Sequence, residues 1–151
     1  MPKNLSEKQP SQNTSIATDS SFPLYLIYTR VSIDDDTTGS HTFETQDKRT
    51  YEFLDRKHGE GQYRVAKFKD DGYSGSLGFR PSAKSKKIRP GLAALTKRVS
   101  EGGCAGVVVY SLSRLFRDLH GMLDLIDEVL LPANIDLFSA TEEFDINDAD
   151  V

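Results

Sequence analysis

The sequence has little of several residue types, and each scarcity excludes a class of protein. A single cysteine, Cys104, excludes an intramolecular disulfide framework and a cysteine-ligated zinc cluster. The three histidines, His41, His58 and His120, lie far apart and lack the spacing of metal ligands. No apolar run approaches the roughly 20 residues that span a bilayer. The N-terminus also lacks the apolar core of a signal peptide, so we expect a cytoplasmic protein.

Charge is unevenly distributed along the chain. The net charge of -4 disfavours a domain that holds nucleic acid by bulk electrostatics. However, the charged side chains of residues 79–98 are all basic, and those of residues 141–151 are all acidic. From charge alone, the basic stretch is either a surface for a polyanion or a solvated loop.

The 151 residues suffice for one domain with a single core. Residues 1–21 are rich in small polar side chains, which predicts disorder. Apolar runs predict four strands, at 24–32, 63–69, 105–110 and 134–141. Helical spacing predicts three helices, over 42–58, 90–102 and 119–130. This order predicts an α/β domain on a mainly parallel sheet of about four to five strands, with helices on both faces.

The first predicted strand ends in residues that carry chemistry. Its sequence LYLIYTRVS is apolar on both faces and then presents Arg30 and Ser32, which share strand parity and therefore one side. Ligands of open α/β sheets bind beyond the carboxyl ends of the strands. Two interpretations stay open: a substrate site, or a helix cap at Ser32 with Arg30 in a surface ion pair.

The run AGVVVY at 105–110 delivers a second group, Ser113, Arg114 and Arg117. Arg114 and Arg117 are three apart at a predicted helix start, so we expect both guanidinium groups to reach one site. A hydroxyl among arginines, with no nearby histidine and no glycine-rich phosphate loop, favours phosphoryl transfer to or from serine. The alternative is a capped helix with surface arginines. The acidic run at 34–36 is expected to be a solvated loop.

Six segments together resemble the catalytic domain of serine recombinases, which are the resolvases, invertases and large serine integrases or transposases. The segments are YTRVS at 28–32, TFETQ at 42–46, DDGYSG at 70–75, IRPGL at 88–92, VVVYSLSRLFRDL at 107–119 and SATEEFD at 139–145. The resemblance implies a resolvase-like catalytic domain over residues 22–146.

The resemblance also implies roles for individual residues. Ser32 matches the nucleophile that attacks a DNA phosphodiester and leaves a 5'-phosphoserine link, and Arg30 matches the arginine that binds the scissile phosphate. The other matched positions are Gln46, which orders the site, Ser74 on a mobile loop near the phosphate, Arg89, which binds phosphate, and the pair Arg114 and Arg117 on the helix after the third strand. No metal or nucleotide cofactor is expected. The implied partners are double-stranded DNA and, in the full-length protein, further copies in a homodimer or homotetramer.

The chain departs from the family pattern in three places. Ser113 stands where many members have an aspartate, which leaves the general acid unassigned. The segment between Ser74 and Arg89 is longer than in small resolvases, so Arg80 competes with Arg89 as the phosphate ligand. Residues 147–151 are expected to begin the connection to a missing long helix and DNA-binding region. The alternatives to an active recombinase are a recombinase-like regulatory or assembly module and a small α/β nucleotide binder.

Overall fold

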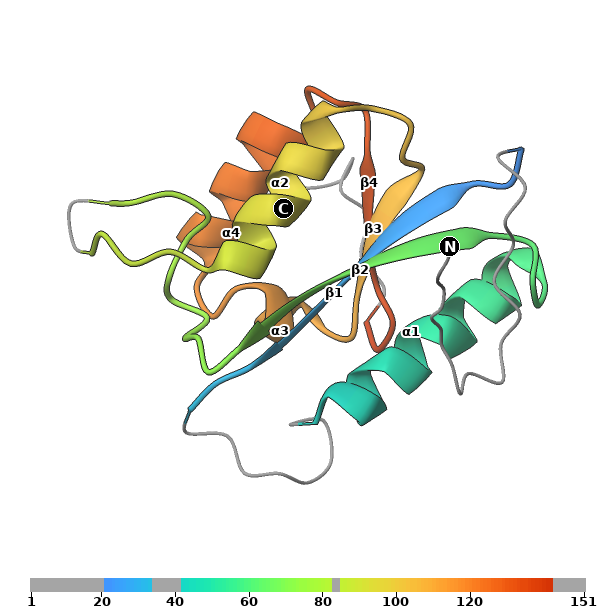
Figure 1. Cartoon of the computed structure of the whole chain (residues 1–151), viewed down its shortest axis with the longest axis horizontal. Coiled ribbons are helices and arrows are strands. Elements are labelled where there is room, and N and C mark those ends of the chain that lie inside the picture. The colour runs from blue at the N-terminus through green and yellow to red at the C-terminus, as the bar shows by residue number, and fades with distance from the viewer. Residues whose placement is uncertain (1–20, 34–41, 83–84, 143–151) are drawn as a thin grey trace, which may run out of the picture.

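Four parallel strands form one sheet in the order β2-β1-β3-β4, with helices packed against both faces (Figure 1). The computed structural model describes residues 21–33, 42–82 and 85–142. The strands are β1 (Leu24–Val31), β2 (Arg64–Asp71), β3 (Gly106–Val109) and β4 (Asp136–Ser139). The α/β prediction is therefore confirmed, with a sheet of four strands.

Successive residues of β1 face opposite helical layers. Leu26 and Tyr28 belong to the cluster formed with α2 (Pro90–Ser100) and α4 (Leu119–Leu125), whereas Ile27 packs with α1 (Phe43–His58). Figure 1 shows α2 and α4 together on one side of the strands and α1 on the other. A central strand that is buried on both faces is apolar at every position, which explains the unbroken run in the sequence.

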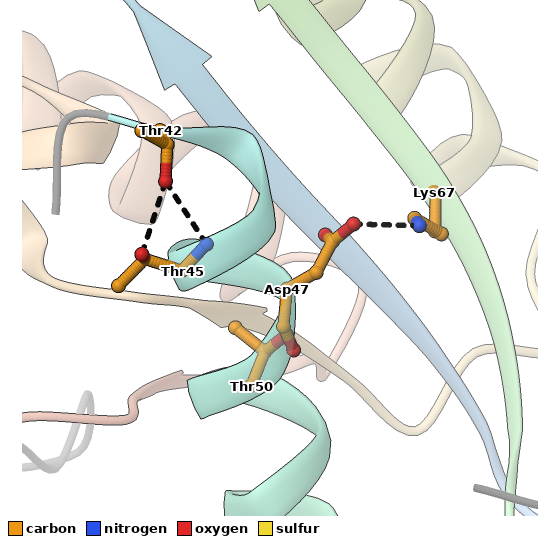
Figure 2. A network of polar contacts seen from close by, with 5 residues as sticks. All are labelled: Thr42, Thr45, Asp47, Thr50 and Lys67. Carbon is orange, nitrogen blue, oxygen red and sulfur yellow. Dashed lines mark hydrogen bonds and ion pairs between the residues drawn. The ribbon is translucent and has the colours of Figure 1, made fainter. Parts of the chain in front are cut away.

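Helix α1 begins and ends where the sequence predicts. Thr42 caps its start, because its hydroxyl oxygen accepts a hydrogen bond from the Thr45 backbone N–H at 3.2 Å (Figure 2). Gly59 follows its end with a φ of 95°, a backbone conformation that favours glycine. Asp47 in its first turns pairs with Lys67 of β2 at 2.8 Å, which joins the helix to the edge strand (Figure 2).

The predicted helix over 119–130 consists of two differently wound parts. α4 is followed by a π-helical turn, η2 (Ile126–Leu130), in which the Leu131 N–H donates to the Ile126 carbonyl. Helical spacing places Leu119 on one face with Met122, Leu123, Ile126, Val129 and Leu130, but Leu119 is not buried with that face, because it is 63% exposed. Leu119 is the first residue of α4 and precedes the turns that pack on the sheet.

Several predictions concern parts of the chain that lie outside the described residues. These are the disorder of residues 1–20, the acidic run at 34–36, His41, and the connection at 147–151. Within the described ranges, no helix is long and apolar enough to cross a membrane.

Candidate active site

The carboxyl end of β1 extends beyond its neighbour β3, and the side chain of Gln46 supplies hydrogen bonds to the β1 backbone there. β1 pairs with β2 through Val31, but its pairing with β3 ends at Tyr28. Beyond that point, the Arg30 backbone N–H donates to Gln46 Oε1 at 3.2 Å and Gln46 Nε2 donates to the Arg30 carbonyl at 2.9 Å. Gln46 is fully buried in α1. Its amide therefore fixes the backbone of Arg30.

Arg30 and Ser32 lie together, as their strand parity predicts. Arg30 Nη1 donates to Ser32 Oγ at 2.5 Å and to the Tyr73 carbonyl at 3.0 Å. Both side chains are nearly inaccessible, with Arg30 2% and Ser32 8% exposed. The alternative of a surface ion pair and a helix cap is therefore wrong, since Arg30 is buried and the cap of α1 is Thr42.

A one-turn helix, α3 (Leu112–Leu115), brings the third strand's residues to this site. Carbonyls at a helix end have no partner within the helix, and here guanidinium groups supply one. Arg30 donates from Nη2 to the Ser113 carbonyl at 3.0 Å and from Nε to the Arg114 carbonyl at 2.8 Å. Arg114 Nη1 donates in return to the Arg30 carbonyl at 3.1 Å. Arg30, Ser32 and Arg114 thus form one hydrogen-bonded cluster.

The start of α3 is held by Glu142, three residues after the end of β4. Glu142 Oε1 accepts hydrogen bonds from the Leu112 backbone N–H at 2.8 Å and from the Ser139 hydroxyl at 2.9 Å. The side chains of Arg30 in β1 and of Glu142 after β4 therefore form hydrogen bonds with opposite ends of α3.

Arg117 does not share a helix with Arg114, and this part of the prediction is wrong. The chain becomes extended at Phe116, with φ -141° and ψ 141°, and Asp118 caps a new helix by accepting from the Gly121 N–H. The exposed Arg117 joins the site through its backbone N–H, which donates to the Gly75 carbonyl at 3.0 Å. A break of three residues is shorter than the helical spacing rule can detect.

Residues 73–75 cover Ser32. Ser32 Oγ lies 3.4 Å from the Tyr73 carbonyl, and a Cβ on Gly75 would lie 2.8 Å from Arg30 Nη2. Sequence reasoning missed both residues, although a glycine in the DDGYSG segment is the kind of signal that marks a close approach. The predicted Ser74 lies on this loop, where its hydroxyl bonds to the Ser76 hydroxyl at 2.8 Å.

Ser113 contacts the cluster through its carbonyl, not through its hydroxyl. Its side chain is exposed, and Ser113 Oγ bonds to Ser111 Oγ at 3.0 Å.

Arg89 occupies the interior beside this cluster. It is fully buried, and Arg89 Nη2 donates to the Leu115 carbonyl, the next carbonyl of α3 after those bound by Arg30. Burial lowers the pKa of Arg89. Arg80, its competitor, is exposed and pairs with Glu128 at 2.5 Å. The geometry therefore places Arg89, and not Arg80, at the helix end that carries the cluster.

A buried carboxylate, which sequence reasoning also missed, supports this arrangement. Asp70 at the end of β2 accepts hydrogen bonds from the Tyr28 hydroxyl at 2.6 Å and from the backbone N–H groups of Gly91 at 2.7 Å and Leu92 at 2.9 Å. It therefore ties β1, β2 and the start of α2 together. Burial, above all, raises the pKa of Tyr28 well above its usual range, so this hydroxyl stays a donor.

The fold resembles solved recombinase structures. The N-terminal catalytic domain of TP901-1 integrase is 27% identical, with a TM-score of 0.66, over 83% of this chain and 84% of that one. Two other solved structures are under 25% identical in sequence, so their similarity is evidence for the fold only. They are the C-terminal catalytic domain of ISC1926 TnpA, an IS607-like serine recombinase (23%, TM-score 0.55, 78% and 70% covered), and a resolvase family site-specific recombinase from Streptococcus pneumoniae (20%, TM-score 0.60, 83% and 77% covered).

The sequence itself matches a family model. None of the curated proteins matches this chain. The family model described as "Resolvase, N terminal domain" matches residues 25–150. This match begins at the second residue of β1, continues past β4 and includes all eight predicted site residues. The chain therefore belongs to the resolvase N-terminal domain family and is a serine recombinase catalytic domain.

Proposed function

We propose that this domain cleaves and rejoins double-stranded DNA at specific sites, with Ser32 as the nucleophile. The observation that carries the proposal is the hydrogen bond from Arg30 Nη1 to Ser32 Oγ at the carboxyl end of β1. Membership of the resolvase family and likeness to the TP901-1 integrase catalytic domain support it.

The proposed reaction is an exchange of phosphodiester bonds. Ser32 Oγ loses its proton and attacks phosphorus, the bond from phosphorus to the 3' oxygen breaks, and that oxygen takes up a proton. The products are a 5'-phosphoserine link and a free 3'-hydroxyl. Rejoining reverses these steps on a new 3'-hydroxyl, and the covalent link conserves the bond energy. Arg30, Arg114 and Arg89 balance the charge that develops on the phosphoryl oxygens, and Arg117 joins them when its segment moves.

Access to Ser32 requires the covering residues to move. The carbonyls of Tyr73, Ser113 and Arg114 accept the guanidinium donors that phosphate oxygens would take. We infer that the loop at 73–75, with Ser74, opens when DNA binds and that strand exchange takes place in a tetramer.

The test is covalent attachment to DNA. We expect Ser32→Ala to abolish the adduct with nicked duplex sites, because no hydroxyl remains to attack, while the circular dichroism spectrum stays unchanged. Mass spectrometry should find the phosphodiester on Ser32 in the unaltered protein. The matched control is Ser100→Ala, which removes an exposed serine at the end of α2. An adduct that persists in Ser32→Ala would refute the proposal.

A second candidate is a regulatory or assembly module that has lost strand exchange. The observation that favours it is Ser113, whose exposed hydroxyl bonds to Ser111 at the position where many family members carry an acid. Cleavage that is absent in the unaltered protein and restored by Ser113→Asp would establish this alternative.

A further inference from the structure

Arg89 is a buried cation with part of its hydrogen-bonding capacity unused. Its guanidinium lies between two aromatic rings, 4.6 Å from the ring centroid of Phe116 and 5.4 Å from that of Tyr28. Arg89 Nη2 donates to the Leu115 carbonyl, but within the described part of the chain Arg89 Nε and Nη1 have no acceptor. A buried donor without an acceptor destabilises the folded state. The surrounding side chains therefore hold Arg89 where two of its N–H donors lack an acceptor, and a bound anion would supply one.

Phe116 separates this charge from open space. Phe116 is only 4% exposed and borders a cavity of about 870 Å³ between residues 76–82, with Ser85 and Lys87, and the start of α4. Phe116 lines that cavity, whereas Arg89 does not. The ring also packs closely on α4, because a Cβ on Gly121 would lie 2.6 Å from Phe116 Cδ1. Phe116 therefore borders both Arg89 and the cavity.

We propose that Phe116 is a positioning residue that covers Arg89 at rest and turns into the cavity, so that Arg89 Nε and Nη1 donate to a phosphate oxygen. This inference rests on the proposed function and adds a side chain that regulates the access of phosphate to Arg89. Phe116 lies in the extended residues between α3 and α4, where a rotation of the ring leaves both helices intact.

The first test measures the accessibility of Arg89 with phenylglyoxal and mass spectrometry. Exposed Arg49 serves as the internal standard. We expect Arg89 to react slowly in the unaltered protein and about tenfold faster in Phe116→Ala, since the cover no longer has to open. Inorganic phosphate should slow this labelling, because it occupies the same donors. Phe116→Leu, which keeps an apolar side chain, should lie between the two and replaces Phe116→Ala if that variant unfolds.

Two results would overturn the inference. One is Arg89 reacting no faster in folded Phe116 variants. The other is fast labelling that phosphate does not slow, since a purely structural Arg89 would be exposed without binding an anion. Both readouts work without DNA, so their failure leaves the assignment of Ser32 standing. Absence of a Ser32 adduct would instead refute the proposed function.

Discussion

At the scale of single residues, Gly75 sets the position of Arg30. A methyl group at this position would lie 2.8 Å from Arg30 Nη2 and 3.1 Å from the Arg117 backbone nitrogen. We expect Gly75→Ala to displace the guanidinium from Ser32 and to slow adduct formation by about 100-fold, since misplacement by 1 Å has effects of that size.

The control for this prediction is Gly78→Ala on the same loop. Its Cβ would meet nothing closer than the Arg80 carbonyl at 3.6 Å, so adduct formation should be unchanged. Equal rates in the Gly75 and Gly78 variants would contradict the prediction.

Asp70 is a structural residue whose charge matters. In Asp70→Asn, one of the two accepting oxygens becomes an amide N–H₂ group that faces a backbone donor, of Gly91 at one oxygen or of Leu92 at the other, and the negative charge is lost. We expect the free energy of unfolding in urea to fall by about 3 kcal/mol. Asp71→Asn, which changes the exposed neighbour, should alter it by less than about 0.5 kcal/mol. A small effect at Asp70 would show that another group accepts these bonds.

Residue-scale prediction from the sequence was right where a side chain follows from strand geometry. Arg30 and Ser32 share one side because strand parity is a local property. The backbone contacts were out of reach. Carbonyls such as those of Tyr73 and Leu115 carry no signature in the sequence, although they hold the buried arginines. Phe116 reads as an ordinary apolar residue until its contact with Arg89 is known.

At the scale of elements, α1 delivers Gln46 to the backbone of Arg30. Its start depends on Thr42, whose hydroxyl donates a hydrogen bond to the Thr45 hydroxyl and accepts one from the Thr45 backbone N–H (Figure 2). We expect Thr42→Ala to lower the free energy of unfolding by about 1 kcal/mol, a typical loss for a helix cap. Thr42→Ser keeps the capping oxygen and should be close to neutral. Equal losses in both variants would mean that the methyl group, not the cap, is responsible.

Element prediction was accurate where caps and periodicity agreed. Thr42, Gly59 and Pro90 mark helix ends in both sequence and structure. It was inaccurate between Leu112 and Leu119, where three residues that include the extended Phe116 and Asp118 separate two short helices. The buried guanidinium groups that hold α3 come from distant segments, so the local sequence does not reveal why this helix ends at Leu115.

At the scale of the whole molecule, β1 and β3 form the middle of the sheet. Leu26, Ile27 and Val107 are fully buried, whereas β2 is an edge strand with exposed positions. Amide hydrogen exchange should therefore be slowest in the middle of β1 and in β3, where exchange requires global unfolding. The amides of β2 should exchange faster. The reverse order, measured by NMR, would contradict this distribution of stability.

The hydrogen bond between the start of α3 and Glu142 has a mechanical consequence. β4 ends at the carboxyl ends of the parallel strands, where Ser32 also lies, and Glu142 after it accepts a hydrogen bond from the start of α3, whose other end is held by two buried guanidinium groups. A displacement of Glu142 would therefore act on a single helical turn whose other end contacts Arg30, the hydrogen-bond partner of Ser32.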